Sequence, residues 1–412
     1  RNLEQLGLTI PKGVIQTTIE QYTVHSPYTS ISISNPEKGI QIASVYRGCG
    51  ALKSPAEDTI SFDAWLLREA RNRGARVVDQ KVSSAFLGSE PGVVIAGEKI
   101  KHDLVVLAVG VNTRPIRISG AEYIPPKVRV MDRDELYAGK AQVEQWLGNR
   151  AHVFLVPHSS LIFGTLVPKG PFISVSVLGS GKYPVSVTDF LTYDLVRRIL
   201  PGQYTRSCGC RPRAVVGAAR NYYADGFVAI GDAAVSRFYK DGIGSALLTA
   251  REAARTAALH GISRLDFERH YQPFCGRLNR DNLWGRMLFS INDRVKDSKA
   301  FLLAQHRLIG DEQKNTGGLQ PFTKAAWGMF TGSYHYRRIA WMTLRPASLA
   351  NLFVAWLWER LGGLFGKAAI APRKLLVGGR KVLILGSGFG GTYALRHLVP
   401  SLNRNENVEV TM

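Results

Sequence analysis

Cysteine is scarce in this sequence: there are four among 412 residues, and none lies in an array typical of disulfides. This scarcity disfavours a secreted, disulfide-stapled fold and predicts a reducing compartment. Cys208 and Cys210 flank one glycine, and such a pair can bind metal, but no second pair lies at zinc spacing. We therefore expect no metal site. Cys49, in a glycine-rich turn, is interpreted as an ordinary small residue, with a position facing cofactor or substrate as the alternative.

Long apolar runs are also missing, because none reaches the roughly 18–20 residues that a bilayer-spanning helix needs. The nearest is LANLFVAWLW at 349–358, which ends at Glu359 and Arg360. The sequence also lacks H-E-x-x-H, G-x-S-x-G and a P-loop, which disfavours the enzyme classes built on those motifs. With no signal-peptide pattern either, we expect a cytoplasmic location.

Acidic residues are few relative to basic ones: 32 Asp and Glu stand against 53 Lys and Arg, a net charge of +21. Such an excess predicts an anionic partner, either a membrane surface, a nucleic acid or an acidic ligand. Between Tyr336 and Arg380 the chain has eight basic residues and one acidic residue, with Trp341, Trp356 and Trp358 among them. This segment is typical of a helix on an anionic membrane, such as the inner face of the plasma membrane, and equally of a buried helix in a helical subdomain. A basic soluble protein is a further alternative, and we expect no nucleic acid.

The sequence predicts a mixed α/β chain with 45% hydrophobic residues, a globular composition. A helix is predicted over 61–75, capped by Ser61 or Asp63 and ended by Gly74. Strands are predicted before and after it, and a further helix over 187–200. Residues 263–366 are predicted to be mainly helical.

One stretch contains most of the residues that could bind a cofactor. In FVAIGDAAVSRFYKDGIGSALLTA, a buried strand ends in Gly231 and Asp232, and a loop leads to Gly242, Ile243 and Gly244 at the start of a helix. An Asp at the end of a strand can accept hydrogen bonds from ribose or ribityl hydroxyls. Glycines at a helix N-terminus let a phosphate or flavin ring approach, and the helix end stabilises negative charge. The alternative is a crossover whose Asp caps a helix.

This stretch resembles the second FAD motif of the geranylgeranyl reductase and aromatic hydroxylase superfamily, with Gly-Asp-Ala-Ala, a loop and Gly-x-Gly before a helix. Further segments follow in the family's order: YRGCG with FDAWLLREARNRGA, HDLVVLAVG ending at Gly110 near the cofactor, and GMFTGSYHYRRI. The resemblance covers about residues 1–345. It implies a Rossmann-like FAD domain that lacks its first βαβ unit. That unit binds the ADP half of FAD and is expected before Arg1, so these residues alone should bind FAD poorly.

The resemblance also implies a division of the chain into five parts. They are a partial FAD domain with substrate-side strands at 1–119, an antiparallel-sheet substrate domain at 120–205, the rest of the FAD domain at 206–262, a helical and membrane-associated region at 263–370, and a linker with an incomplete dinucleotide-binding unit at 371–412.

Several positions depart from the family pattern. Hydroxylases often have Asp-Gly where this chain has Val109 and Gly110, and His where it has Val235, while Pro is frequent at the position of Tyr239. The missing Asp argues against an NADPH-dependent aromatic hydroxylase. We therefore expect an FAD-dependent reductase, and the family resemblance implies an isoprenoid lipid or a quinone as its substrate. An FAD-dependent monooxygenase, and a basic membrane- or nucleic-acid-associated binding protein without redox activity, are the alternatives, and no catalytic residue is identified.

The C-terminal stretch KVLILGSGFGGTYALRHL has a strand followed by Gly386, Gly388 and Gly391 in G-x-G-x-x-G spacing, and NVEVTM is a second predicted strand. It resembles the opening of type II NADH dehydrogenases, which implies NAD(P)H as a further cofactor. Because this unit is incomplete at Met412 and the FAD motif is incomplete at Arg1, we expect a junction between two fused flavoproteins, cut on both sides.

Overall fold

The computed structural model divides the chain into two compact units, Arg1–Glu359 and Arg360–Met412, which are described separately. The residues that it describes are 3, 7–37, 42–46, 60–113, 115–156, 160–179, 185–239, 241–315, 318–362, 380–383 and 408–411. Cys49, Gly386, Gly388 and Gly391 lie outside them, so the predictions on these residues stay predictions.

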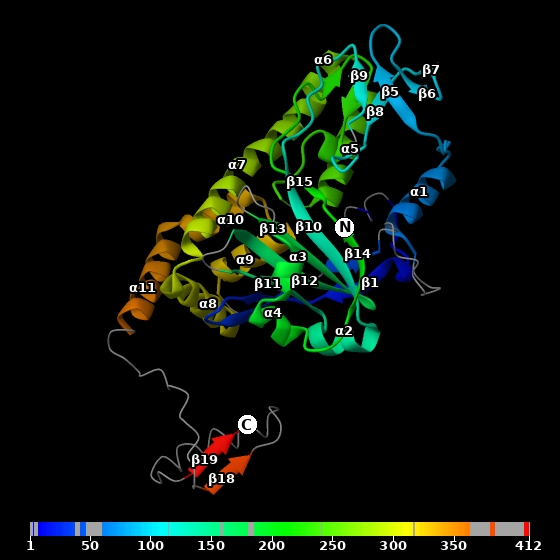
Figure 1. The fold of residues 1–412 in the computed structure, drawn as a ribbon. Coiled ribbons are helices and arrows are strands. Elements are labelled where there is room, and N and C mark those ends of the chain that lie inside the picture. Colours follow the sequence, from blue (N-terminus) through cyan, green and yellow to red (C-terminus); the bar gives the residue numbers. More distant parts are fainter. Residues whose placement is uncertain are drawn as a thin grey trace. The chain divides into compact units, whose positions relative to one another are not determined.

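A mixed sheet of eight strands dominates the first unit (Figure 1). Its order is β14-β10-β13-β12-β11-β2-β3, and β15 pairs with β10. The strands are β2 (Gln21–His25), β3 (Ser30–Ser34), β10 (Val128–Tyr137), β11 (Arg150–Phe154), β12 (Leu161–Lys169), β13 (Phe172–Gly179), β14 (Thr205–Cys210) and β15 (Arg213–Val215). Only β2 and β11 pair in parallel. The antiparallel sheet predicted within 120–205 is confirmed, and β2 and β3 join it from much earlier in the chain.

Three short helices cover one face of this sheet: α2 (Lys140–Leu147), α3 (Val187–Leu191) and α4 (Asp194–Ile199). Alternate apolar residues of the strands point into this layer, as the period of two in a strand requires. The contact is close at Gly164 in β12, where an added Cβ would lie 2.2 Å from a ring carbon of Phe190.

The single helix predicted over 187–200 is wrong, because the chain turns between α3 and α4. Tyr193 has extended backbone angles, with φ −63° and ψ 133°, which interrupt the helix. The Thr192 hydroxyl donates a hydrogen bond to the Asp189 carbonyl at 2.6 Å, which closes the end of α3. Phe190 and Val196, from the two helices, both become buried in the same core. The turn therefore interrupts the helix but lets residues of both halves pack against the sheet.

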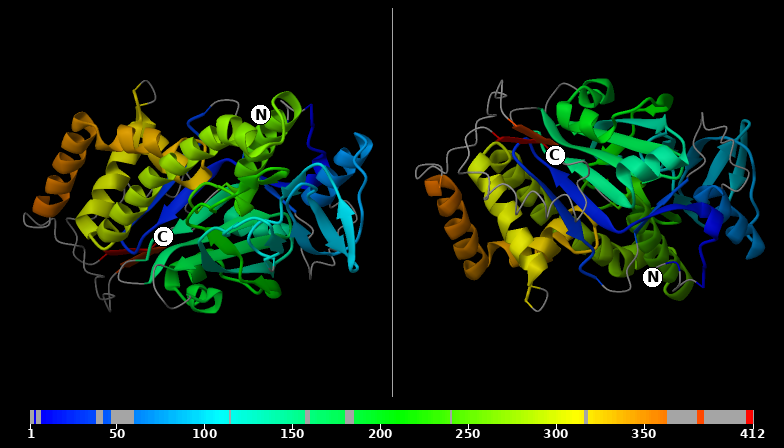
Figure 2. Two further views of the ribbon diagram at one scale, coloured as in Figure 1. Left: turned by 90° about the horizontal axis from the view of Figure 1, so that it is seen from above. Right: turned by 90° about the horizontal axis from the view of Figure 1, so that it is seen from below.

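Longer helices lie on the other face, coloured yellow-green to orange in Figures 1 and 2. They are α7 (Gln272–Val295), α8 (Lys299–Lys314), α9 (Pro321–Thr331), α10 (Tyr336–Leu344) and α11 (Pro346–Gly362). The helices α8 and α9 pack on β2, β3 and β11 through Leu302, Phe322 and Trp327. The mainly helical region is thereby confirmed as far as the structure describes it. No helix among the described residues is both long and apolar enough to cross a bilayer.

A second, smaller sheet contains the strands of the predicted cofactor motif: β16 (Tyr223–Ala224), β17 (Phe227–Ala229) and β8 (Val105–Leu107). The strands β17 and β8 are parallel, and helix α5 (Gly242–Leu259) follows β17. Next come α6 (Arg264–Asp266) and a π-helical turn (Phe267–Tyr271), whose aromatic residues are buried beside Val228. Within the described residues β8 is an edge strand, and Val106 is 47% exposed.

The remaining elements of the first unit are smaller. They are a 3₁₀ turn (Lys12–Val14), the antiparallel pair β1 (Ile15–Ile19) and β4 (Ile42–Val45), helix α1 (Phe62–Asn72), and a sheet of β7 (Glu98–Lys101), β6 (Gly92–Ile95), β5 (Val82–Phe86) and β9 (Arg117–Ser119). Ser61 caps α1 by accepting the Ala64 N–H at 3.2 Å, so the first of the two predicted caps is confirmed. The helix ends before Gly74, whose φ is +93°, as predicted.

The second unit contains two described strands, β18 (Arg380–Leu383) and β19 (Val408–Thr411), which pair in parallel. Val382 is opposite Val410 in this register. Both strands were predicted. The glycine turn and helix predicted between them lie outside the described residues.

Candidate functional site

The predicted cofactor residues gather at the carboxyl ends of β8 and β17. The two strands run side by side, and the Ile230 N–H donates to the Leu107 carbonyl at 3.0 Å just beyond their last pair. Gly231 and Asp232 come just after β17, and Gly110 comes shortly after β8. Because the two strands are parallel neighbours, both segments leave the sheet at the same edge. This edge of a parallel sheet is where α/β folds bind their ligands.

Gly231 connects this turn to helix α5. Its backbone has φ +59°, a conformation that favours glycine, and its N–H donates to the buried Thr249 hydroxyl at 2.8 Å. An added Cβ at Gly231 would lie 3.2 Å from the Ala246 Cβ, so the turn lies almost against the helix. Glycine at position 231 is thus favoured by the backbone conformation and by the close approach of strand and helix.

The Asp232 carboxylate lies beside the first turn of α5. An added Cβ at Gly242 would be 3.3 Å from Oδ2 of Asp232, so the carboxylate and the glycine backbone are neighbours. Gly110 has φ +65°, and an added Cβ there would meet no atom within 4 Å. The Asp232 carboxylate and the Gly242 backbone thus lie side by side without an intervening side chain, and we call this turn of the chain the glycine cradle. The Ile243 side chain, predicted with this group, points outward and is 40% exposed.

Asp241 caps helix α5 and was not identified from the sequence. It has φ +56°, and its Oδ1 accepts the Gly244 N–H at 3.1 Å. An added Cβ at Gly244 would lie 2.3 Å from that oxygen, which explains the second glycine of the motif. Desolvation by the surrounding protein raises the pKa of the Asp241 carboxyl, against the charge of Arg237 and the hydrogen bond from Gly244.

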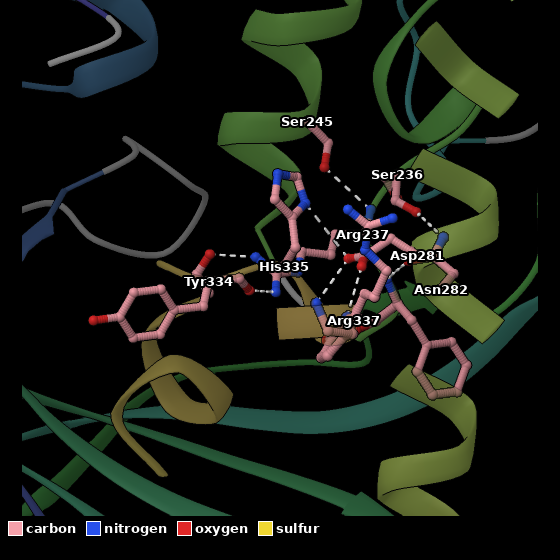
Figure 3. A network of polar contacts seen from close by, with 11 residues as sticks. Ser236, Arg237, Ser245, Asp281, Asn282, Tyr334, His335 and Arg337 are labelled. Atoms are coloured by element: carbon pink, nitrogen blue, oxygen red, sulfur yellow. Dashed lines mark hydrogen bonds and ion pairs between the residues drawn. The ribbon is translucent and has the colours of Figure 1, made fainter. Parts of the chain in front are cut away.

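The Asn282 side chain of α7 forms hydrogen bonds to the loop between Asp232 and α5. Asn282 accepts the Phe238 N–H and donates to the Ser236 carbonyl, both at 2.9 Å (Figure 3). Asn282 is 5% exposed, so these bonds are shielded from water. The Arg237 N–H between them donates to the Ser245 hydroxyl in α5 at 3.1 Å. The loop is therefore held from both sides.

A second set of contacts ties the same loop to α10. The Arg237 guanidinium donates to the carbonyls of Gly332 and Tyr334, and it lies 4.4 Å from the centre of the Tyr336 ring. The Tyr336 hydroxyl donates to the Phe238 carbonyl at 2.6 Å. Gly332, Tyr334 and Tyr336 fall within GMFTGSYHYRRI, the segment that carried part of the family resemblance. Its structural role is to hold the loop.

Asp281 orients the first turn of α10. Its two carboxylate oxygens accept the N–H groups of Tyr336 and Arg337, each at 2.9 Å. Burial alone would raise the pKa of Asp281, but hydrogen bonds from His335, Arg337 and Tyr336 outweigh it and hold the pKa below the ordinary value. Asp281 is 8% exposed. Sequence patterns gave no signal for it, because its partners lie more than fifty residues away.

A cavity of about 480 Å³ lies between the large sheet and the helices α7–α11. Phe163, Thr165 and Val167 of β12 face it, while the alternate residue Leu166 faces the opposite core. Tyr239 and Asp241 of the cofactor-motif loop also line the wall. The loop therefore borders both the glycine cradle and the cavity. The described lining residues include no Lys or Arg.

Cys208 and Cys210 lie in β14, which pairs with β10 at one end of the large sheet. Neither is among the described residues that line the cavity. In the described part of the chain, no group of three or more His, Cys, Asp or Glu side chains has the arrangement of a metal site.

No protein-family model and no curated protein matches the sequence. Several solved structures have the same fold. A geranylgeranyl bacteriochlorophyll reductase-like protein from Thermoplasma acidophilum is 13% identical with a TM-score of 0.52, over 86% of this chain and 87% of its own. The flavin-dependent brominase Bmp2 is also 13% identical with a TM-score of 0.52, over 76% and 80%. CtdE, solved with FAD and a substrate, is 13% identical with a TM-score of 0.52, over 85% and 88%.

These similarities establish the fold. The chain has a mixed α/β architecture that matches the fold of FAD-binding reductases and monooxygenases, as the sequence predicted, and the flavin-dependent brominase has this fold too. The predicted cofactor residues Gly231, Asp232, Gly242 and Gly244 lie between the end of β17 and the start of α5, and Gly110 follows the neighbouring strand β8.

Replacing Asp281 with Asn should destabilise the protein at neutral pH by about 1–3 kcal/mol, since one of two buried N–H groups loses its acceptor. A carboxylate with a depressed pKa stabilises the fold above the pKa of the unfolded chain, and this stability is lost as the pH falls through the folded-state pKa. The difference between wild type and Asp281→Asn should therefore shrink below about pH 4. Urea denaturation across pH measures it, with the exposed Asp311→Asn as the control. A pH-independent difference would contradict the role given to the charge.

Proposed function

We propose that this protein is an FAD-dependent oxidoreductase, a reductase that acts on an isoprenoid lipid or a quinone. The observation that carries the proposal is the described part of the loop before α5, in which Tyr239 and Asp241 line an apolar cavity while Asp232 and Gly242 at its two ends form the glycine cradle. The fold shared with flavin-dependent enzymes supports the cofactor. The apolar lining of the cavity supports the substrate class.

The residues of the cradle fit the demands of FAD. Asp232 offers an acceptor for ribityl or ribose hydroxyls beside Gly242, and the glycines leave room for the ligand. The N-terminus of α5 provides partial positive charge, which stabilises negative charge on a flavin. FAD would supply hydride transfer, and the protein would supply binding, orientation and exclusion of water. The electron donor that reduces the flavin is proposed to be NAD(P)H, since the sequence 381–412 resembles the start of an NADH dehydrogenase.

The cavity fits a long apolar substrate. Its volume lies within the roughly 300–1,000 Å³ of ligand pockets. Its described walls combine strand residues such as Val167 with helix residues such as Phe289, Met329 and Leu352. Burying an isoprenoid chain against such walls contributes on the order of 25 cal/mol per Å² of apolar surface.

Asp241 is the candidate proton donor of a reduction. It lines the cavity and is the N-cap of α5, next to Gly242 of the cradle. Desolvation raises the pKa of its carboxyl group, and a carboxyl group in this place can give a proton to a reduced double bond or carbonyl. Among the described lining residues it is the sole carboxyl group.

The helices α10 and α11 form the proposed membrane surface. Trp341 and Trp358 are 67% and 64% exposed, and Phe353 and Val354 lie between them in the sequence, also exposed. Basic residues accompany them: the Arg345 guanidinium lies 5.9 Å from the centre of the Trp341 ring. Exposed aromatic and apolar groups beside cations suit the interface of an anionic membrane.

The same two helices line the cavity. Leu344 of α10 and Leu349 and Leu352 of α11 contribute to its wall. A substrate dissolved in the membrane would therefore meet the helices that border the substrate space. This arrangement favours a lipid substrate over a soluble one.

Replacing Asp232 with Ala in the complete protein should weaken FAD binding about tenfold to a hundredfold, because a charge-assisted hydrogen bond is lost. The flavin content after purification and the Kd of added FAD measure this effect. Asp79→Ala, an exposed carboxylate outside the site, is the matched control. Equal flavin content in the two variants would remove Asp232 from the cofactor site.

Replacing Asp241 with Asn should keep the helix cap, because Asn caps helices as well as Asp and tolerates a positive φ. It removes the acidic proton, so lipid-dependent oxidation of the reduced flavin should slow by about 10²–10⁴-fold. Flavin content should stay at the wild-type level. An unchanged rate would show that the proton comes from elsewhere.

The double change Trp341→Ser and Trp358→Ser should reduce binding to vesicles, and so should Arg337→Gln with Arg338→Gln. Each Lys or Arg near an anionic surface contributes about 1 kcal/mol, and salt screens it. Co-sedimentation with anionic and neutral vesicles at low and high salt measures the contribution of the tryptophans and that of the arginines. Trp284→Ser, an exposed residue of α7, is the control. Binding that ignores lipid charge and salt would refute the membrane surface.

A further inference from the structure

A second pocket lies on the other face of the large sheet from the cavity. Its volume is about 580 Å³, and its walls come from β10, the helices α3 and α4, and the start of β14. Met131 of β10 lines the cavity, whereas Asp134 and Leu136 of the same strand line the second pocket, as the period of two in a strand requires. The two spaces share no described lining residue, and we call the second one the edge pocket.

The edge pocket differs from the cavity in its charge. Two basic residues line it, Arg197 of α4 and Arg206 of β14, against one acidic residue, Asp134. Positive charge is therefore in excess by one among its described lining residues. The described walls of the cavity contain no Lys or Arg. The two faces of the sheet thus suit ligands of different charge.

Arg206 is held in place by a buried carboxylate. Asp134 is 1% exposed, its Oδ1 accepts a hydrogen bond from Arg206 Nη2 at 2.8 Å, and its Oδ2 lies 2.7 Å from Arg206 Nε. Gly209 is opposite Asp134 in the strand register, and an added Cβ there would lie 2.8 Å from Asp134 Oδ1. The glycine between Cys208 and Cys210 therefore makes room for this pair. The Arg206 side chain is 55% exposed, so its remaining N–H groups can reach a ligand.

Further donors line the edge pocket on its helical side. Arg197 is exposed and forms no ion pair with any described residue. The hydroxyl groups of Thr188 and Tyr204 also line the space, and neither has a hydrogen-bond partner in the described part of the chain. Between these donors the wall is apolar, and it is formed by Leu136, Leu191, Leu200 and Pro201. The edge pocket thus combines cations and hydroxyl donors with an apolar floor.

We propose that the edge pocket binds a small organic anion, a carboxylate or a phosphate monoester attached to an apolar body. Arg197 and Arg206 would contact the anionic group, since a guanidinium pairs with carboxylate and phosphate oxygens through parallel N–H groups. The leucine side chains would bury the apolar body. The volume lies within the roughly 300–1,000 Å³ of ligand pockets. This site is separate from the cradle and the cavity, so the inference goes beyond the proposed function.

Calorimetric titration of the complete protein with four probes tests the proposal. The probes are benzoate, phenyl phosphate, inorganic phosphate and benzyl alcohol. The two aromatic anions should each bind at least about threefold more tightly than inorganic phosphate, which lacks the apolar body, and than benzyl alcohol, which lacks the charge. Added salt should weaken the anions and leave the alcohol unchanged. The tighter of benzoate and phenyl phosphate identifies the anionic group.

Replacing Arg197 with Gln should weaken binding of both aromatic anions about 3- to 10-fold, because one cation of the site is lost. Arg198→Gln is the matched control, since Arg198 is an exposed neighbour in α4 that does not line the edge pocket. Arg206→Gln alone would leave the Asp134 carboxylate buried without a partner. The second test is therefore Asp134→Asn together with Arg206→Gln, which should weaken the anions to a similar extent, and thermal melting checks that each variant folds.

Equal affinity of the anions for wild type and Arg197→Gln would overturn the proposal. So would equal losses in Arg197→Gln and Arg198→Gln, which would show an effect of net charge alone. Benzyl alcohol binding as tightly as benzoate, or no binding of any probe, would also overturn it. None of these outcomes involves FAD or a lipid, so the proposed function is tested independently.

Discussion

The paired hydrogen bonds of Asn282 to the loop backbone, at Ser236 and Phe238, are the constraint on which the site depends. They fix a segment that carries the cofactor motif at one end and the helix cap at the other. Because Asn282 is buried, the backbone groups of Ser236 and Phe238 have no water to replace it. The position of Asp241 relative to Asp232 follows from this anchor. So does the shared border between the cradle and the cavity.

The helical layer serves several purposes at once. The helices α8 and α9 complete the core of the large sheet through Trp327 and Phe322. Interiors are normally packed to high density, so the cavity beside this core is a departure, and the proposed substrate would fill it. The apolar surface left exposed on α10 and α11 is a second departure. A lipid-handling enzyme accounts for both departures with one substrate.

Sequence reasoning predicted the local parts of this structure better than its long-range parts. The glycines and the Asp of the cofactor motif are close together in the sequence, so Gly231, Asp232 and Gly242 could be placed together from their spacing. Asp281 and Asn282 act on segments about 45–55 residues away, and no periodic pattern marks such partners. The cavity arises where two layers meet, so its lining residues are dispersed over the chain. The turn at Tyr193 was missed because packing of Phe190 and Val196 overrides helix propensity there.

The central claim is that a flavin and an apolar substrate meet across the loop that Asn282 anchors. Anaerobic stopped-flow absorbance tests it most directly, with the flavin of the complete protein first reduced and then mixed with a prenyl quinone or prenyl alcohol substrate in detergent. The account predicts that the absorbance of oxidised flavin returns at a rate that saturates with lipid concentration and does not require oxygen. Reoxidation by oxygen alone, with the lipid without effect, would contradict the account and favour a monooxygenase.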